Sequence, residues 1–310
     1  MHITVWGAGS LGLLFAGKLA GSGYRTELVP RSAAQREELQ ANGVKVLEPD
    51  GEECRSRPIV TENPAGARDN PDWIFLMVKQ KDIGAGLAGQ LAGRMGESTR
   101  LLCFQNGAGH LERLGAMLPP DRIYAAVTTE AARKESPWEV RHTGKGTILW
   151  GIPKPFEGGT SPAVDASLND VLRRAGFTPQ RSEDIRTAMW DKLLINAVIN
   201  PLTGLLSVPN GALLENRESE DLMRRLLQEG VEVLTREGYT ADNTLGDRVR
   251  TVCRQTAANS SSMLQDLTKG RKTEIEWING YLLRLADKHG VDLPVNRTLY
   301  SLIKLKEGQG

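Results

Sequence analysis

The pattern of hydrophobic and polar positions divides the chain into two halves with different periods. In the first half, short uninterrupted apolar runs alternate with amphipathic segments, which is typical of buried parallel strands joined by helices. Such runs occupy residues 2–6, 26–29, 72–78, 101–104 and 123–127. Beyond residue 183 only helical periods follow, from a helix that opens at Met189 to those at residues 218–237, 246–258, 273–289 and 297–306. The sequence therefore predicts an α/β domain at residues 1–183 and an all-helical domain at residues 184–310.

Weaker patterns predict further elements in the first half of the chain. They predict helices at residues 11–20, 32–41 and 164–175, short strands at residues 44–47 and 59–60, and an edge strand at residues 178–182. Two further strand patterns, residues 138–142 and 147–150, flank the glycines at 144 and 146. This arrangement predicts an antiparallel hairpin that completes the sheet.

The helix that opens at Met189 carries three polar residues on an otherwise apolar circumference. Lys192, Asn196 and Asn200 stand four residues apart, and because this step drifts only about 40° around the helix, they form one narrow stripe. A buried polar stripe needs partners and so indicates a ligand; alternatively, Lys192 reaches solvent and the asparagines bond nearby backbone. Pro201 is expected to kink or stop this helix near residue 199.

The segment that follows the first strand reads GAGSLG and precedes an apolar helix pattern. In this context a first glycine permits a tight turn, a second lets the backbone approach a pyrophosphate, and a third allows close helix packing. We therefore expect a Rossmann-type dinucleotide-binding domain. Its predicted cofactor contacts are Gly7, Ala8, Gly9, Ser10, Leu11 and Gly12.

Three side chains follow the ends of strands at the edge where such sheets bind ligands. Arg31 stands where an NAD-preferring site usually has a carboxylate, and a guanidinium suits a 2′-phosphate, so NADPH is favoured over NADH. Glu27 lies within the strand, too early to accept from the ribose. Lys79 and Asn106 follow the next two buried strands. Taken singly, Arg31 and Lys79 fit solvated surface residues and Asn106 fits a turn.

Two places in the second half combine polar groups with helix signals. Asn259 and the three serines at 260–262 precede an apolar helix segment. Thr273 and Glu276 form a capping-box pattern, which places Glu274 in the first turn of the next helix. Each place also has a purely structural explanation, a helix break for the serines and a favourable helix dipole for Glu274.

Composition narrows the classes of partner. The 310 residues carry a formal net charge of +1, which does not favour nucleic acid as a target. Three scattered cysteines and four histidines show no metal-ligand spacing, so no metal is expected and a reducing compartment is favoured. No apolar run reaches membrane-spanning length, so a cytoplasmic protein without a membrane partner is expected. The sequence leaves the oligomeric state open between monomer and homodimer.

Taken together, these motifs resemble the ketopantoate reductase (2-dehydropantoate 2-reductase) family. The resemblance rests on GAGSLG, on VK and QNG after the two buried strands, on KLLINAVINPLTGLL and PNG, and on NSSSMLQD and GRKTEIEWINGYL. It implies NADPH-dependent reduction of 2-dehydropantoate to (R)-pantoate, a step towards pantothenate and coenzyme A.

The resemblance also implies roles for individual residues. The family's general acid falls on Lys192, and its second essential polar residue falls on Glu274. Substrate-binding positions fall on Asn106, Lys192, Asn196, Asn200, Asn210, Asn259 and Ser262, and cofactor positions beyond the glycine-rich segment fall on Arg31, Lys79, Asn106, Ala132 and Glu274. Glu130 departs from the pattern, because a carboxylate is not expected near an anionic substrate.

The chemistry of a 2-keto acid fits these residues. An ammonium such as Lys192 can stabilise and protonate the developing alkoxide, whereas no histidine has a comparable setting. Polar donors at 259–262 could hold the carboxylate, and Glu274 could accept from a 4-hydroxyl group. Two alternatives remain: a related NADPH-dependent reductase of another 2-keto acid, and a non-catalytic NADPH-binding regulatory protein.

Overall fold

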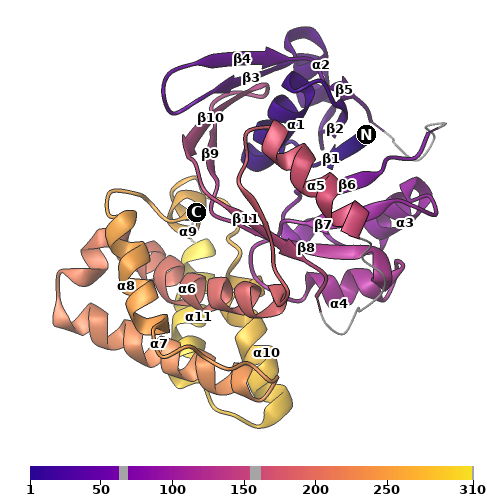
Figure 1. Ribbon diagram of the computed structural model, residues 1–310. Helices are drawn as coiled ribbons and strands as arrows, with labels where there is room; N and C mark the ends of the chain where they lie inside the picture. Colours follow the sequence, from indigo (N-terminus) through magenta and orange to yellow (C-terminus); the bar gives the residue numbers. More distant parts are fainter. Residues whose placement is uncertain (63–68, 154–161, 309–310) are drawn as a thin grey trace. The chain divides into compact units, whose positions relative to one another are not determined.

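The computed structural model describes residues 1–62, 69–153 and 162–308, and the chain forms two compact units (Figure 1). The N-terminal unit comprises Met1–Gln105 and His110–Arg186, and the C-terminal unit comprises Asn106–Gly109 and Thr187–Gly310. The short segment Asn106–Gly109 thus leaves the sheet unit and packs with the helices, where the backbone N–H of Ala108 donates to the carbonyl of Trp277 at 3.0 Å.

An eight-stranded sheet forms the centre of the N-terminal unit. Its strands are β1 (His2–Trp6), β2 (Arg25–Val29), β5 (Ile59–Val60), β6 (Trp73–Leu76), β7 (Arg100–Cys103), β8 (Ile123–Thr128), β11 (Ile148–Gly151) and β12 (Pro179–Arg181). They lie in the order β12-β11-β8-β7-β6-β1-β2-β5, and all neighbouring pairs are parallel except β8 and β11. The predicted α/β fold class is confirmed.

The helices of this unit follow the strands. They are α1 (Ser10–Gly21), α2 (Ala33–Asn42), α3 (Ala85–Arg94), α4 (His110–Gly115) and α5 (Pro162–Arg174), with 3₁₀ turns η2 (Gln80–Asp82) and η3 (Pro120–Arg122). Phe15 of α1 anchors the core by stacking on Phe177 at 4.2 Å between ring centroids and by meeting Phe104 edge to face at 4.9 Å. The helix that starts at the glycine-rich turn is therefore packed rigidly on the sheet.

The predicted hairpin of residues 138–142 and 147–150 is wrong. A second sheet contains β4 (Glu53–Ser56), β3 (Val44–Leu47), β10 (Glu139–Gly144) and β9 (Ala131–Lys134) in that order. β10 pairs with β3 and β9, whereas β11 pairs with β8 and β12. Gly146 lies between the two strands and packs closely on Thr129, since a Cβ at this position would lie 2.4 Å from Thr129 Oγ1.

The C-terminal unit contains only helices within the residues that the structure describes. They are α6 (Ile185–Leu206), η4 (Asn210–Leu214), α7 (Arg217–Thr235), α8 (Leu245–Gln255), α9 (Ser262–Thr268), η5 (Ile275–Trp277), α10 (Asn279–His289) and α11 (Pro294–Glu307). α6 is buried on most sides, through Leu193, Leu194, Ala197 and Val198. The predicted all-helical second half is confirmed.

Pro201 does not stop α6, contrary to one of the two predicted outcomes. A proline has no N–H to donate, so the carbonyl four residues earlier, that of Ala197, loses its helical partner. The side-chain amide of Asn279 donates to this carbonyl at 3.0 Å and replaces the missing bond. Asn279 itself is fully buried and donates also to Asn296 Oδ1 at 2.9 Å. A tertiary contact thereby lets the helix continue for five residues past the proline.

The predicted capping box is also wrong. The α-helix begins only at Asn279, and Glu274 is the residue before the short η5 turn. Thr273 donates its backbone N–H and its hydroxyl to Glu307 Oε1 at 2.7 and 2.6 Å, while Glu276 binds Arg284 and Tyr300. The two residues of the box therefore have separate partners on α10 and α11, which local sequence does not reveal.

Candidate functional site

The glycine-rich turn between β1 and α1 has the geometry that its sequence predicts. Gly7 has a φ of 114°, and a Cβ there would lie 2.9 Å from the Met77 backbone, while a Cβ at Gly12 would lie 1.8 Å from the Gly7 carbonyl oxygen. Gly9 has no heavy atom within 4 Å of such a Cβ, and no side chain in the described parts of the chain caps α1. The first N–H groups of α1 can thus meet a phosphate, so these residues fit a dinucleotide.

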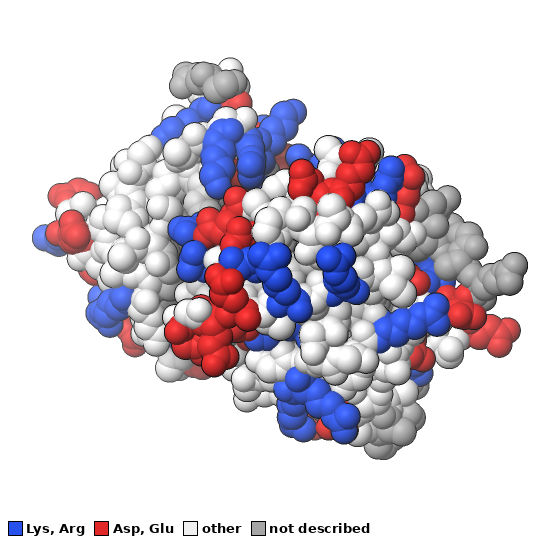
Figure 2. All heavy atoms as spheres, turned by 90° about the horizontal axis from the view of Figure 1, so that it is seen from above, with Lys and Arg blue, Asp and Glu red and all other residues white. Residues whose placement is uncertain are grey.

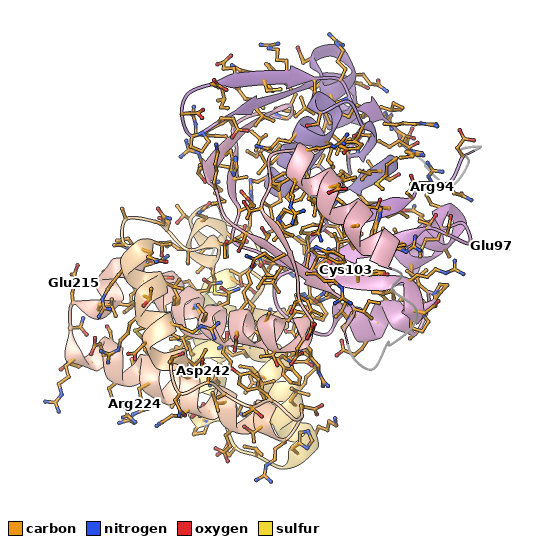
Figure 3. The ribbon with its side chains drawn as sticks, viewed as in Figure 1. Arg94, Glu97, Cys103, Glu215, Arg224 and Asp242 are labelled. Carbon is orange, nitrogen blue, oxygen red and sulfur yellow. The ribbon has the colours of Figure 1, made fainter. Side chains whose placement is uncertain are left out.

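Arg31 follows the end of β2 by two residues and is exposed. Its guanidinium is 3.4 Å from Asp82 of η2, and the side chain keeps 80% of its surface accessible. Glu27 has a different setting, because its carboxylate is buried and accepts two hydrogen bonds from Arg94, at 2.9 and 2.7 Å. Arg94 is the last residue of α3 and is labelled in Figure 3. Glu27 is therefore committed to a structural ion pair, while Arg31 can reach a ligand.

Gln105 is a residue whose role sequence reasoning missed. It follows β7, and its side-chain amide donates to the carbonyls of Leu76 and Val78 at 2.8 and 3.1 Å. These bonds join the end of β7 to the turn that leads to Lys79, which precedes η2. The only available signal was its place in the QNG motif. Gln105 holds the predicted cofactor residue Lys79 in register with the strand that leads to Asn106.

Glu130, the departure from the family pattern, is buried and paired. Its Oε2 lies 2.6 Å from His142 Nε2, and the other ring nitrogen of His142 lies 3.0 Å from Glu48 Oε2. The sequence did not indicate these polar contacts of His142. Its two partners come from separate segments of the chain, 94 and 12 residues away, so sequence spacing gave no indication. Ala132, a predicted cofactor residue, follows Glu130 by two positions at the start of β9.

Lys192 lies on α6 in an environment that does not favour its charge. Burial lowers the pKa of its ammonium group to about 8, and the carboxylate of Glu274 partly opposes this shift. The side chain is half-buried, so the alternative in which Lys192 reaches solvent stays open beside the proposed ligand contact. The preceding residue, Asp191, accepts from Tyr239 at 2.5 Å and from Arg248 at 2.8 Å, which fixes this part of the helix. Asn196 is half-buried and Asn200 is buried on the same stripe.

Two other segments of the C-terminal unit are tied together by backbone bonds. The N–H of Asn210 donates to the carbonyl of Asn259 at 3.0 Å, and the Asn210 side chain donates to Thr256 at 2.9 Å. Gly211 allows this approach, because a Cβ there would lie 2.7 Å from Ala257. Asn210 and Asn259 are therefore neighbours although 49 residues of sequence separate them.

Two of the serines have different settings. Ser261 caps α9, since its hydroxyl accepts from the Leu264 N–H at 3.1 Å, and it lies 2.7 Å from Thr203 Oγ1 of α6. Ser262, the predicted substrate residue, is exposed in the first turn of α9. One serine therefore shapes the segment, and the next remains accessible.

The predicted residues divide between the two units. The glycine-rich turn, Arg31, Lys79 and Ala132 belong to the N-terminal unit. The predicted substrate-binding and catalytic residues all belong to the C-terminal unit: Asn106, Lys192, Asn196, Asn200, Asn210, Asn259, Ser262 and Glu274. Asn106 belongs to the same unit as Lys192 and Glu274, although it follows a strand of the sheet.

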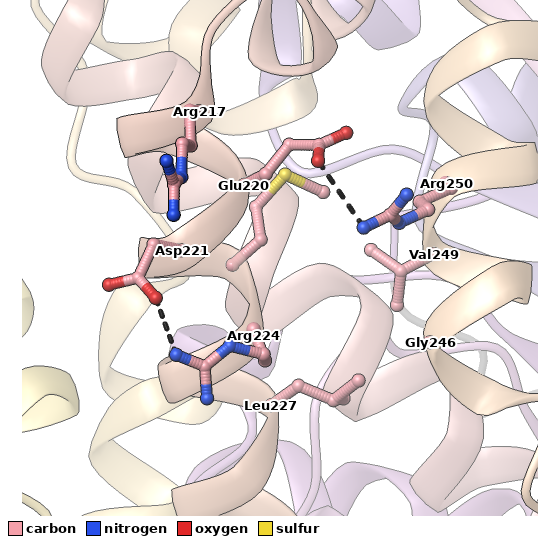
Figure 4. A pocket seen from close by; sticks show the side chains of 9 residues that line it. Arg217, Glu220, Asp221, Arg224, Leu227, Gly246, Val249 and Arg250 are labelled. Carbon is pink, nitrogen blue, oxygen red and sulfur yellow. Dashed lines mark hydrogen bonds and ion pairs between the residues drawn. The ribbon is translucent and has the colours of Figure 1, made fainter.

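A separate cavity of about 420 Å³ lies between α7 and α8, away from these residues in sequence (Figure 4). Its floor is apolar, with Met223 and Val249, and its rim is charged. Arg224 is paired with Asp221, and Arg250 is paired with Glu220 at 3.3 Å. Arg217 is the remaining charged residue of the lining, so four of its five charged side chains are paired with one another.

The described surface shows basic and acidic side chains next to each other on the face in Figure 2. Within residues 1–62, 69–153 and 162–308, no helix has the length and apolar character needed to cross a membrane. The same residues contain no group of three or more His, Cys, Asp or Glu side chains that could hold a metal ion.

The chain matches known protein families over nearly its full length. Residues 3–155 match the family model of ketopantoate reductase PanE/ApbA, and residues 184–307 match the model of the C-terminal part of the same family. A 2-dehydropantoate 2-reductase of Halobacterium salinarum is 33% identical over 310 residues, which cover 100% of both chains.

Solved structures give the same result. The crystal structure of a PanE/ApbA family ketopantoate reductase from Ralstonia eutropha JMP134 has a TM-score of 0.88 at 27% identity, and the match covers 100% of this chain and 99% of that one. D-mandelate dehydrogenase, in a ternary structure with NADH and anilino(oxo)acetate, has a TM-score of 0.90 at 25% identity with the same coverage.

Proposed function

Because this chain belongs to the ketopantoate reductase PanE/ApbA family, we propose that it reduces 2-dehydropantoate to (R)-pantoate with NADPH, in pantothenate and coenzyme A biosynthesis. One observation on this chain supports the proposal independently of the family. Lys192 is a desolvated ammonium whose pKa is lowered to about 8, and Glu274 acts on it electrostatically. A lysine of this kind can supply a proton near neutral pH.

Lys192 is the proposed general acid. Bound NADPH would supply a hydride to the carbonyl carbon, and the carbonyl oxygen then needs a proton. The Nζ of Lys192 first donates a hydrogen bond to this oxygen, which stabilises the negative charge that develops on it, and then transfers its proton. Desolvation makes this transfer easier than for a lysine in water, because the neutral amine is less unfavourable in a buried position.

The proposed substrate clamp consists of amides and a hydroxyl. Asn196 and Asn200 on α6, Asn210 and Asn259 on the bonded segments, and the exposed Ser262 can donate to the carboxylate and the hydroxyl group of the substrate. Glu274 is proposed to accept from the 4-hydroxyl group and to keep Lys192 protonated. Asn106, brought into the same unit by its own segment, completes the set.

The proposed cofactor residues are those of the N-terminal unit together with Asn106 and Glu274. The backbone of residues 7–12 fits the pyrophosphate, and the exposed guanidinium of Arg31 suits the 2′-phosphate of NADPH. Lys79 and Ala132 are proposed to line the remainder of the cofactor site. NADPH is also the cofactor expected for the family.

A second candidate is the reduction of another 2-keto acid. The similarity to D-mandelate dehydrogenase, whose structure contains NADH and anilino(oxo)acetate, favours this alternative over a non-catalytic regulatory role. A regulatory protein would have no need for the lysine and carboxylate pair on the C-terminal unit. The two reductase functions differ in whether the substrate carries a hydroxyl group that donates a hydrogen bond to Glu274.

A keto acid panel tests the proposal. NADPH oxidation is followed with 2-dehydropantoate, with 2-oxoisovalerate, which lacks the hydroxymethyl group, and with phenylglyoxylate. We expect a kcat/KM for 2-dehydropantoate at least about tenfold above the others, since the loss of the proposed hydrogen bond between the 4-hydroxyl group and Glu274 costs about 1 to 3 kcal/mol. A preference for phenylglyoxylate would favour the second candidate, and NADPH binding without any turnover would favour the regulatory role.

The remaining expectations are part of the same proposal. We propose that residues 1–183 and 184–310 are the two domains, and that the protein acts in the cytoplasm on a small-molecule 2-keto acid without a nucleic-acid partner. The mixed surface charge supports the last point, and the separate free cysteines Cys54, Cys103 and Cys253 are compatible with a reducing compartment.

A further inference from the structure

Four ionisable side chains of the N-terminal unit form a continuous chain of contacts, which we call the His142 network. Lys18 Nζ of α1 lies 2.6 Å from Glu48 Oε1, Glu48 Oε2 lies 3.0 Å from His142 Nδ1, and His142 Nε2 lies 2.6 Å from Glu130 Oε2. The His142 side chain is 0% exposed and that of Glu130 is 2% exposed. The network therefore runs from α1 to the connection between β8 and β9.

The two ring nitrogens of His142 each face a carboxylate oxygen, that of Glu48 on one side and that of Glu130 on the other, and Lys18 stands at the far end of the network. A carboxylate oxygen accepts the hydrogen bond that an imidazole N–H donates. Burial raises the pKa of Glu48, but the bonds from Lys18 and His142 outweigh it, and the pKa is lowered overall.

The segment that carries Glu130 lies against the glycine-rich turn. Lys134, at the end of β9, donates its backbone N–H to Ser10 Oγ at 3.2 Å and its side-chain ammonium to the Ala8 carbonyl at 3.3 Å. The residue before Glu130, Thr129, makes two hydrogen bonds with Thr147. Its N–H donates to the Thr147 carbonyl at 3.0 Å, and its hydroxyl oxygen accepts from the Thr147 N–H at 2.9 Å. Residues 129–134 thus connect the rest of the unit to the proposed phosphate-binding backbone.

An ionic network of this kind is better suited to fixing geometry than to adding stability. Burying several charges costs desolvation energy that their mutual attraction only partly offsets. Apolar residues of similar size often stabilise a fold to the same extent or more. A fully bonded chain does, however, select one arrangement of the backbone, because every alternative leaves a buried charge unpaired. The element fixed most directly is the connection at Glu130.

We propose that Glu130 and His142 are positioning residues for the cofactor: they hold residues 129–134 against the glycine-rich turn and so set the affinity for NADPH. They do not touch the reacting atoms. Their effect is transmitted through Lys134 to Ala8 and Ser10, and through Ala132, which stands opposite His142 in the pairing of β9 and β10. The proposal rests on the proposed function only in taking NADPH as the ligand of this turn.

The test compares Glu130→Ala with Glu130→Gln. The glutamine retains a carbonyl oxygen that can accept from His142 Nε2, whereas alanine leaves that donor buried and unpaired. We expect Glu130→Ala to raise the KM for NADPH, and its dissociation constant in a fluorescence titration, about tenfold, as the loss of one buried charged bond suggests. At saturating NADPH, kcat should stay within about twofold of wild type, and Glu130→Gln should recover most of the affinity.

Arg141→Gln is the matched control. Arg141 precedes His142 on β10 but is exposed and binds only Glu135 among the described side chains, at 3.1 Å, so its loss should leave the NADPH constants unchanged. If Glu130→Ala fails to fold, Lys134→Met removes the side-chain bond to the Ala8 carbonyl, leaves the backbone bond to Ser10 in place, and should raise the same constant.

The outcomes separate this inference from the proposed function. If the melting temperature and kcat fall in Glu130→Ala while both NADPH constants stay at the wild-type value, the network is structural only and the inference is wrong. If the wild-type protein itself does not bind NADPH, the proposed function fails first. A cofactor constant that rises equally in Glu130→Gln and Glu130→Ala would exclude the accepted bond as the cause.

Discussion

The proton donor assigned to Lys192 makes the reaction depend on pH in a defined direction. Burial lowers its pKa from 10.5 to about 8, and the reduction needs the protonated form. With a pKa of about 8, only about one tenth of the protein is protonated at pH 9, whereas an ordinary lysine would remain almost fully protonated. The kcat/KM for the keto acid should therefore be level below about pH 7 and fall about tenfold per unit well above pH 8.

Glu274→Gln tests whether the carboxylate contributes to this behaviour. Glu274 raises the pKa of Lys192, so its removal should lower that pKa further. A neighbouring opposite charge commonly shifts a pKa by about one unit or more. The falling limb of the variant should therefore move to lower pH by about one unit, and the ratio of wild-type to variant kcat/KM should be about tenfold larger at pH 9 than at pH 6.

The assay measures initial rates of NADPH oxidation between about pH 6 and pH 10 in buffers of constant ionic strength. Loss of a substrate contact alone would lower kcat/KM equally at every pH, so the change in the ratio isolates the electrostatic effect. Glu276→Gln is the control, since this carboxylate binds Arg284 and Tyr300 and is not among the groups that shift Lys192. A wild-type profile that stays level to pH 10 would refute the role of Lys192 as a desolvated acid.

Three further predictions concern single residues. Lys192→Ala should lower kcat by about two to four orders of magnitude, and a variant within about threefold of wild type would remove Lys192 from the mechanism. Arg31→Ala should raise the KM for NADPH about tenfold with little change for NADH, whereas equal effects would contradict a 2′-phosphate contact. Burial lowers the pKa of His110 to about 3, and neither ring nitrogen has a partner among the described residues. Because the folded-state pKa lies below the unfolded value of 6.5, the neutral ring stabilises the fold fully above that pH. The unfolding free energy should then fall by about 1.4 kcal/mol per unit between roughly pH 6 and pH 3. His110→Leu should reduce this slope in urea titrations, and an unchanged slope would contradict the reasoning.

The sequence alone predicted those parts of the fold that depend on local chemistry. The turn at Gly7 and Gly12 follows from close backbone approach, and the stripe of Lys192, Asn196 and Asn200 follows from helical spacing. Both were correct as local structure because the residues concerned are neighbours in the chain. The roles assigned to them remain predictions, since the family resemblance and not the spacing supplied them.

The wrong predictions concern places where contacts between distant segments of the chain determine the structure. Residues 138–150 have the local pattern of a hairpin, but β10 pairs with β3, which precedes it by more than ninety residues. The pattern at Thr273 and Glu276 matched a capping box, but Glu307 and Tyr300 of α11 take these groups. Helix α3 was not predicted because several glycines lower its helix propensity, and the burial of Ala88, Leu91 and Arg94 compensates for this.

The correction at Pro201 has a consequence for the proposed site. Because Asn279 replaces the missing bond at Ala197, Lys192 and Thr203 lie on one uninterrupted helix, about 16 Å apart at 1.5 Å per residue. Thr203 contacts the capping serine of α9, so the proton donor and the segment that bears Ser262 are placed by the same rigid element. A helix that ended at residue 199 would leave the two free to move separately. The buried Asn279 amide therefore determines how accurately the proposed acid and the proposed carboxylate clamp are spaced, although it is not itself a proposed substrate contact.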